Sequence, residues 1–148
     1  MSEFKPRSAD YATRVLASFA KQAFMTHIGA KIVHVAPGEV DVDLPARDDL
    51  NQQHGFFHAG TTSAIADSAA GYAAFSLFPA DRGVLTTEYK INLLNPGRGE
   101  RLIARGRVMK PGRTLTVCRS DVFGITGGEE TIVATGLFTM MAVEGFTN

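Results

Sequence analysis

Residues 60–77 read GTTSAIADSAAGYAAFSL, and nearly every side chain in this stretch is small or apolar. A helix that is apolar on all sides is usually buried, whereas a surface helix keeps one polar face. The stretch therefore predicts a helix that the rest of the chain encloses. Its one charged residue is Asp67, and a carboxylate is seldom fully buried without a partner.

Period-two alternation of apolar and polar residues follows this helix almost to the C-terminus. It predicts four strands, at 83–94, 100–110, 113–124 and 131–142. Short turns separate them, and strands joined by short turns pair antiparallel, so we expect each strand to pair with the next. Two further strands are expected before the helix, at 30–35 and 39–44, joined by the turn residues Pro37-Gly38.

The first part of the chain has apolar residues at helical spacing. We expect one amphipathic helix over about 8–27, with Ser8 as its N-cap and Gly29 at its end. An antiparallel sheet can bury a single apolar helix by curling around it, which is the α+β architecture called the hotdog fold. We expect one domain over 1–148, with the hotdog core at about 28–142, and a homodimer formed through exposed sheet edges.

The overall composition argues against several classes of protein. Lys plus Arg and Asp plus Glu balance at 15 each, so the net charge gives no reason to expect a nucleic acid or a membrane as partner. The single cysteine, Cys118, cannot form an intrachain disulfide, and residues 1–14 lack the apolar segment of a signal peptide. These two features predict a cytoplasmic protein. No compact metal-ligand motif occurs, so we expect no metal, and we expect no separate cofactor.

Asp67 has a structural and a functional interpretation. In the first, its carboxylate bonds to a neighbouring loop or strand. In the second, burial makes it a better base or nucleophile at neutral pH. The preceding residues 51–60, NQQHGFFHAG, favour the second interpretation. They place the small residues Ala59 and Gly60 at the start of the helix, where unpaired backbone N–H groups can bind a carbonyl oxygen.

The spacing between these two features limits how they act together. Asp67 lies eight residues after Ala59, which is about 12 Å along a helix axis. One carbonyl group cannot contact both ends of that span. The carboxylate and the amide of one site must then come from different subunits, so the site is predicted at a dimer interface.

The segment His58-Ala59-Gly60, followed by Asp67 and a helix of small residues, resembles the hotdog-fold thioesterases of the phenylacetate-pathway (PaaI-like) type. That family carries His-Gly-Gly, with an aspartate nine residues after the histidine. His58 and Asp67 keep this spacing. The resemblance covers about 28–142 and implies hydrolysis of a small, medium-chain or aromatic acyl-CoA. It also implies a homodimer, assembled further as a dimer of dimers, with coenzyme A entering only as part of the substrate.

The resemblance further implies roles for individual residues. Asp67 would act as general base or nucleophile, which the sequence does not decide. The Ala59 N–H would bind the carbonyl oxygen, with Ala59 in place of the first motif glycine. The amide side chain six residues before the histidine would position the water or the carbonyl. That residue is Gln52, with Asn51 beside it as the alternative.

Two further assignments leave alternatives open. An assisting hydroxyl on the strand after the helix would be Thr86, although Thr87 is adjacent and an ordinary strand threonine is an equal interpretation. His58 is either a general acid or base or, as is commoner in this pattern, a structural residue of its loop.

Basic residues concentrate late in the chain. Seven of the 15 Lys and Arg residues fall within 98–119, where Glu100 is the only acid. A solvated, charged strand face would explain this, and so would binding of the coenzyme A phosphates, to which arginine is well suited. The candidates for phosphate binding, chosen from the resemblance, are Lys110, Gly112, Arg113, Arg98, Lys90 and Asn92.

Two other functions remain as alternatives. A hydratase or dehydratase on the same fold would act on acyl thioesters with a histidine and a carboxylate, but the chain lacks the His-Phe-Pro-Gly loop of the dehydratases of fatty-acid synthesis. A non-catalytic acyl-CoA-binding protein is the second. The 27 residues before the expected hotdog core are too few for a complete helix-turn-helix domain, so a DNA-binding sensor is disfavoured.

Overall fold

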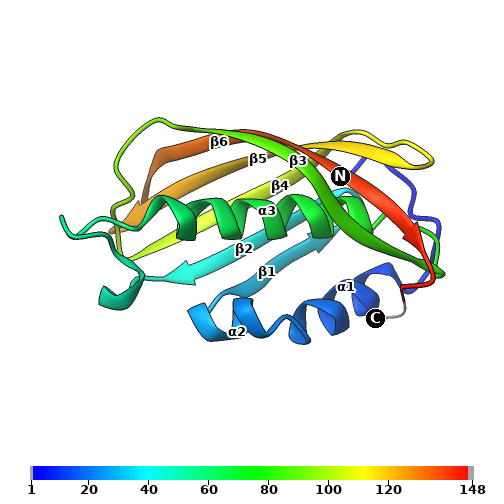
Figure 1. Cartoon of the computed structure of the whole chain (residues 1–148), viewed down its shortest axis with the longest axis horizontal. Coiled ribbons are helices and arrows are strands. Elements are labelled where there is room, and N and C mark those ends of the chain that lie inside the picture. Colours follow the sequence, from blue (N-terminus) through cyan, green and yellow to red (C-terminus); the bar gives the residue numbers. More distant parts are fainter. Residues whose placement is uncertain (1, 147–148) are drawn as a thin grey trace.

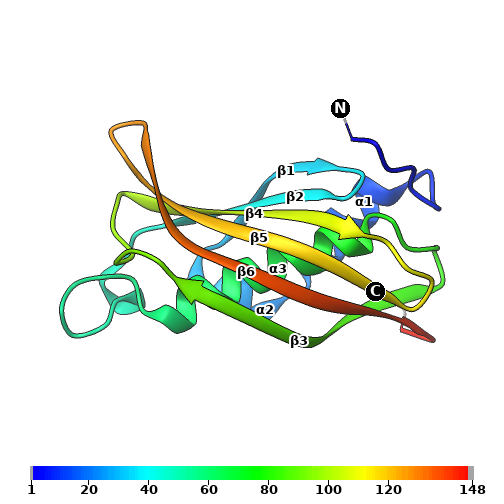
Figure 2. The ribbon, with the colours of Figure 1, turned by 90° about the horizontal axis from the view of Figure 1, so that it is seen from above.

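A six-stranded antiparallel sheet and one long helix make up most of the computed structural model, which describes residues 2–146 (Figure 1). The sheet curls around the long helix α3, and two short helices lie before the first strand (Figure 2). The elements are α1 Tyr11–Ala20, α2 Ala23–Ile28, β1 Lys31–Ala36, β2 Glu39–Pro45, the 3-10 turn η1 Asp48–Leu50, α3 Ala59–Phe75, β3 Arg82–Leu93, β4 Arg101–Lys110, β5 Leu115–Thr126 and β6 Glu129–Glu144. This arrangement confirms the predicted hotdog fold.

The strand order is β1-β2-β4-β5-β6-β3, so β1 and β3 are the edges of the sheet. The prediction that every strand pairs with the next was wrong at one place. β3 pairs with β6, and β4 pairs with β2. Asn95-Pro96-Gly97 is therefore a crossover and not a hairpin turn. It is held by Phe57, whose N–H donates to the Gly97 carbonyl at 2.9 Å.

The expected single N-terminal helix is two helices. α1 ends at Ala20, and the backbone at Gln22 is extended, with φ −75° and ψ 96°, before α2 begins. The N-cap of α1 is Asp10 and not Ser8; the Ser8 hydroxyl instead donates to the Asp10 carboxylate. Gly29 ends α2 in the left-handed conformation, with φ 82°, which confirms the expected helix end.

Small residues on both sides let α3 lie directly on the sheet. Ala69 and Ala70 of α3 are fully buried, and they face Gly106 of β4. A Cβ atom at Gly106 would lie 2.2 Å from the Ala69 carbonyl oxygen and 2.7 Å from the Ala70 nitrogen. The apolar helix is thus enclosed as the sequence predicts.

Gly106→Ala should lower the free energy of unfolding by about 1–3 kcal/mol or more, because the added methyl group must push α3 away from β4. Urea denaturation followed by circular dichroism measures the change. Gly71→Ala in α3 is the matched control, since its Cβ would meet only the Met140 sulfur, at 3.9 Å. A Gly106→Ala midpoint equal to that of the control would contradict the tight helix–sheet contact.

Two observations limit the chemistry available elsewhere in the chain. Cys118 is buried in β5, and burial raises the pKa of its thiol to about 12, so it is not a nucleophile at neutral pH. Within residues 2–146, the His, Cys, Asp and Glu side chains form no group of three that could hold a metal ion. No helix of the same residues is long and apolar enough to cross a membrane.

Candidate active site

The N-terminus of α3 presents one free backbone donor. His58 is the N-cap, and its Nδ1 accepts a hydrogen bond from the Gly60 N–H at 2.8 Å. The Thr61 and Thr62 N–H groups donate to the His58 carbonyl. Among the residues that the structure describes, the Ala59 N–H has no acceptor. Since Ala59 is exposed, its N–H is available to a ligand oxygen, at the positive end of the helix dipole.

The loop before α3 is held by the side chain that was expected to contact substrate. The Gln52 Oε1 accepts from the N–H groups of His54, at 2.5 Å, and Phe56, at 3.4 Å. The Gln52 N–H donates to the Phe56 carbonyl at 2.8 Å. Asn51 forms an isolated antiparallel bridge with Phe57. Two residues are candidates for the amide that positions water or the carbonyl, Gln52 and Asn51. Only Gln52 also lines a pocket, which favours Gln52.

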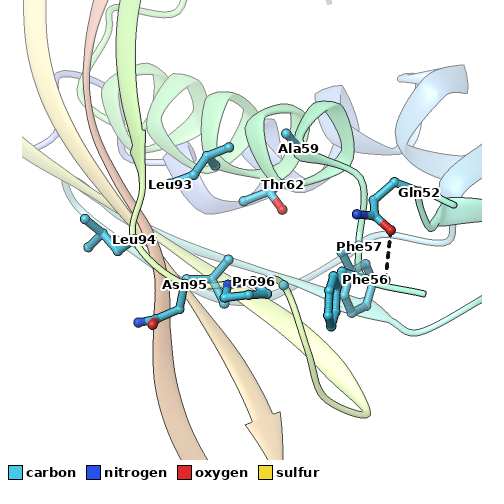
Figure 3. Close-up of a pocket in the computed structure, with 11 residues that line it drawn as sticks. Gln52, Phe56, Phe57, Ala59, Thr62, Leu93, Leu94, Asn95 and Pro96 are labelled. Carbon is cyan, nitrogen blue, oxygen red and sulfur yellow. Dashed lines mark hydrogen bonds between the residues drawn. The ribbon is translucent and has the colours of Figure 1, made fainter. Parts of the chain in front are cut away.

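A pocket of about 380 Å³ opens beside the N-terminus of α3 (Figure 3). It lies between the loop before α3, the first turn of that helix and the crossover after β3. Its lining residues are Gln52, Phe56, Phe57, Ala59, Thr62, Leu93, Leu94, Asn95, Pro96, Gly97 and Val133. The lining is mostly apolar, and its polar residues are Gln52, Thr62 and Asn95.

Sequence reasoning missed the crossover as a wall of this pocket. Leu93 and Leu94 are 54% and 50% exposed, although two consecutive leucines at a strand end are normally assigned to the core. The signal that marks them is their position just before Asn95-Pro96-Gly97, where the strand pattern stops.

Asp67 lies in the middle of α3 and is bonded to β3. The Thr86 hydroxyl donates to the Asp67 carboxylate at 2.7 Å. Thr87 points away, and its hydroxyl donates to the Thr139 carbonyl at 3.1 Å. Burial raises the pKa of Asp67, and the hydrogen bond from Thr86 partly lowers it again. Among residues 2–146, the carboxylate therefore has one neutral donor and no cation to hold it, as suits a general base or a nucleophile.

The Ala59 donor and the Asp67 carboxylate are not brought together within one chain. Asp67 does not line the pocket beside Ala59, and eight helical residues separate the two by about 12 Å. The single chain thus holds the two groups at different heights on one helix.

The basic residues of 98–119 divide into two groups. Four arginines on strands are neutralised by carboxylates: Arg101 by Asp43, Arg105 by Glu130, Arg107 by Asp41 and Arg119 by Asp121. Among the described residues, Arg98, Lys110 and Arg113 form no ion pair. Arg98 instead stacks on the Phe56 ring, with 4.5 Å between its guanidinium carbon and the ring centroid.

The remaining candidates for phosphate binding lie in two different places. Lys90 and Asn92 share the outer face of the sheet, where the Lys90 ammonium donates to the Asn92 side-chain oxygen at 2.6 Å. They line a hollow of about 310 Å³ together with Met109, Arg119, Thr135, Gly136 and Leu137. Gly112 lies in the turn between β4 and β5, and its N–H donates to the Thr116 hydroxyl at 3.4 Å. The structure therefore does not gather all six candidates into one site.

Comparison with known proteins identifies the family. Residues 54–131, more than half of the chain, match the thioesterase superfamily. A thioesterase family protein from Silicibacter pomeroyi is 49% identical, with a TM-score of 0.90, and the match covers 91% of this chain and 99% of that one. The PaaI protein from the phenylacetic acid degradation operon of E. coli has the same fold, with a TM-score of 0.84 and 20% identity over 96% of this chain and 99% of that one.

A more distant relative was found by sequence. A protein of Saccharolobus solfataricus, named as an esterase, is 28% identical over 90 residues, or 61% of this chain. The chain spans 64% of that protein's length. Together, these matches confirm the predicted hotdog fold and the predicted class of enzyme, a thioester hydrolase, and the chain belongs to the thioesterase superfamily.

Proposed function

We propose that the chain hydrolyses acyl-CoA to a free acid and coenzyme A, with Asp67 as general base or nucleophile. The observation that supports this most directly is the environment of Asp67. Its carboxylate is half-buried on an apolar helix, its pKa is raised by that burial, and its bond to the Thr86 hydroxyl fixes its orientation. The reaction requires no cofactor, because coenzyme A enters as part of the substrate.

The bonds made and broken are few. In the general-base route, Asp67 takes a proton from water while the water oxygen adds to the thioester carbon. The carbonyl oxygen becomes an oxyanion, bound by the Ala59 N–H. Collapse of this intermediate breaks the carbon–sulfur bond, and the coenzyme A sulfur leaves with the proton that Asp67 held. In the nucleophilic route, Asp67 adds to the carbon first, and the carbon–sulfur bond breaks to release the coenzyme A thiolate. Water then cleaves the acyl-enzyme anhydride to the free acid and the Asp67 carboxylate, and a proton from that water ends on the thiolate.

A second copy of the chain would complete the site. The Ala59 N–H and the Asp67 carboxylate are too far apart to act on one carbonyl, so each site would take one group from each subunit. β3 supports this arrangement, because it is a sheet edge of 12 residues that carries Thr86 next to Asp67. Every side chain from Leu85 to Lys90 is exposed, and a long open edge is a template for pairing with another strand.

The coenzyme A phosphates would bind to the cations that have no carboxylate partner. Arg98, Lys110 and Arg113 meet this condition among the described residues, whereas the four strand arginines are already neutralised. We therefore favour Arg98, Lys110 and Arg113 over the paired arginines as phosphate ligands.

Release of free thiol from acetyl-, hexanoyl-, dodecanoyl- and phenylacetyl-CoA, followed with a thiol reagent, tests the proposal. The panel spans short, medium, long and aromatic acyl groups, so the same assay names the preferred class. Release from none of the four would overturn hydrolysis of acyl-CoA, and calorimetric titration of the same esters would then test for binding without turnover.

Thr86→Val should move the acidic limb of the pH–rate profile to higher pH. Asp67 works only as a carboxylate, so the rate falls as pH drops through its pKa. The Thr86 hydroxyl stabilises the charged form and lowers that pKa, and removing it raises the pKa. The measurement is kcat/KM against pH for hexanoyl-CoA or the best ester of the panel.

Two variants make that result specific. Thr86→Ser keeps a hydroxyl and should restore the wild-type limb. Thr87→Val removes the neighbouring hydroxyl, which bonds Thr139 and not Asp67, and should leave the limb in place. A Thr86→Val limb at the wild-type pH would show that the hydrogen bond does not tune the working carboxylate.

A further inference from the structure

A second pocket lies beside α3, toward the end of the helix that is away from Ala59. Its volume is about 260 Å³, and its lining residues are Ser18, Lys21, Gln22, Tyr72, Gly83, Val84 and Phe146. Val84 and Thr86 face the same side of β3, because their partners on β6 are Ala142 and Met140, both buried. Val84, which lines the pocket, and Thr86, which bonds Asp67, therefore lie on one face of β3.

α3 leaves room between Asp67 and this pocket. Gly71 follows Asp67 by one helical turn and lies on the same face of the helix. A Cβ atom at Gly71 would meet only the Met140 sulfur, at 3.9 Å. Tyr72 follows Asp67 by five residues, which is about 7.5 Å along the helix axis and about 140° around it. An acyl group whose thioester carbon lies at Asp67 would pass Gly71 to reach the second pocket.

The far end of this pocket is polar. The Ser18 hydroxyl lies 3.1 Å from the Tyr72 hydroxyl, and the Ser68 hydroxyl donates to the Gln22 side-chain oxygen at 3.4 Å. The Tyr72 hydroxyl also bonds to Gln22, and burial raises the pKa of Tyr72. A pocket meant only for hydrocarbon would not be expected to hold two hydroxyls and an amide at its end.

The break between α1 and α2 creates this polar end. α1 stops at Ala20, and the backbone at Gln22 is extended before α2 begins (Figure 1). The Gln22 side-chain oxygen accepts a hydrogen bond from the Ser68 hydroxyl of α3. If α1 and α2 were one continuous helix, residue 22 would be rotated further around the helix axis. Ser18, Gln22 and Tyr72 can each donate and accept, and their mutual bonds use only part of that capacity. Lys21 is exposed at the rim.

We propose that this pocket binds the far end of the acyl group and selects short acyl chains that carry a hydroxyl there, through Ser18, Gln22 and Tyr72. The inference rests on the proposed acyl-CoA hydrolysis and adds its substrate class. Ser18 is half-buried and Gln22 is exposed, so water can bond them in the free chain. An acyl chain that ends in a methyl group would displace that water without replacing its hydrogen bonds, whereas a hydroxyl would replace them.

The test compares two esters that differ only at the far end, hexanoyl-CoA and 6-hydroxyhexanoyl-CoA. The wild-type chain should show a kcat/KM about tenfold or more higher for the hydroxylated ester. Tyr72→Phe and Gln22→Leu should each bring the ratio of the two kcat/KM values close to one. Tyr11→Phe makes the same chemical change on α1, outside the pocket, and should keep the wild-type ratio. Equal kcat/KM values in the wild type, or a preference that both pocket variants retain, would overturn the inference.

A binding experiment separates this inference from the proposed function. The Asp67→Asn variant is titrated calorimetrically with each intact ester. If the wild type releases no thiol from either ester, hydrolysis fails, and the two dissociation constants still decide the pocket. Tighter binding of 6-hydroxyhexanoyl-CoA, lost in the Asp67→Asn/Tyr72→Phe double variant, supports the inference, and equal dissociation constants overturn it.

Discussion

Asp67→Asn should lower kcat for acyl-CoA hydrolysis by about 10²–10⁴-fold, the range over which a positioned base contributes. Asparagine has nearly the same shape as aspartate, and its side-chain oxygen still accepts the bond that Thr86 donates at 2.7 Å. The exchange therefore removes basicity and nucleophilicity while it keeps the packing of α3 on β3. Thiol release from the best ester of the panel gives the rate, and circular dichroism and light scattering report the fold and the assembly.

A matched control is available at the surface. Asp81 precedes β3 and its side chain is 74% exposed. Asp81→Asn therefore removes a carboxylate without altering Asp67 or its hydrogen-bond partner Thr86. The Asp81→Asn variant should keep the wild-type rate of thiol release. If Asp67→Asn, folded and assembled as the wild type, also kept that rate, Asp67 would be a structural aspartate, and the proposed mechanism would fail.

The buried helix and its aspartate could be predicted from sequence because their signal is local. Residues 60–77 are apolar all round, and the structure places α3 at Ala59–Phe75. The spacing from Ala59 to Asp67 likewise depends only on helix geometry, so the distance between the Ala59 N–H and the Asp67 carboxylate could be predicted from the sequence. Strands β4 to β6 agree with the predicted ranges to within about two residues for the same reason, since alternation is a property of neighbours.

What could not be predicted depends on contacts between distant segments. A turn sequence such as Asn95-Pro96-Gly97 marks where a strand ends, and it does not say which strand comes next in the sheet. Here, closure of the sheet around α3 places β6 beside β3 and β2 beside β4. The break at Gln22 is similar, because the helical spacing of apolar residues continues through it and gives no warning. The pocket between α1, α3 and β3 could therefore not be predicted from the sequence.

The choice between Thr86 and Thr87 shows where a pattern becomes ambiguous. A bulge between Thr86 and Glu88 interrupts the pairing of β3 with β6, so period-two alternation does not carry through this point. The structure gives the contact with Asp67 to Thr86, the residue that the sequence favoured. The catalytic role of that contact stays a prediction, to be decided by the pH profile of Thr86→Val.

Ala59→Pro should lower kcat by about 10²–10³-fold, the loss seen when one oxyanion donor is removed. Proline lacks the N–H and is well tolerated at the first position of a helix, which Ala59 occupies in α3. The preceding residue, His58, already has the extended backbone that a following proline requires, with φ −61° and ψ 139°. The variant is therefore expected to fold normally, with an unchanged urea midpoint, while losing a single donor.

Mixing this variant with Asp67→Asn tests whether one site uses two subunits. Each homodimer would lack a working site, because every site would miss either the amide or the carboxylate. A mixed dimer would hold one doubly defective site and one with both groups intact. Random reassociation of equal amounts makes half of the dimers mixed, so activity should return to about a quarter of the wild-type value per site. The control is the Ala59→Pro/Asp67→Asn double variant mixed with either single variant, which can form no intact site. Failure to recover activity in verified mixed dimers would show that Ala59 and Asp67 do not meet across an interface, and the oxyanion donor would have to be sought elsewhere.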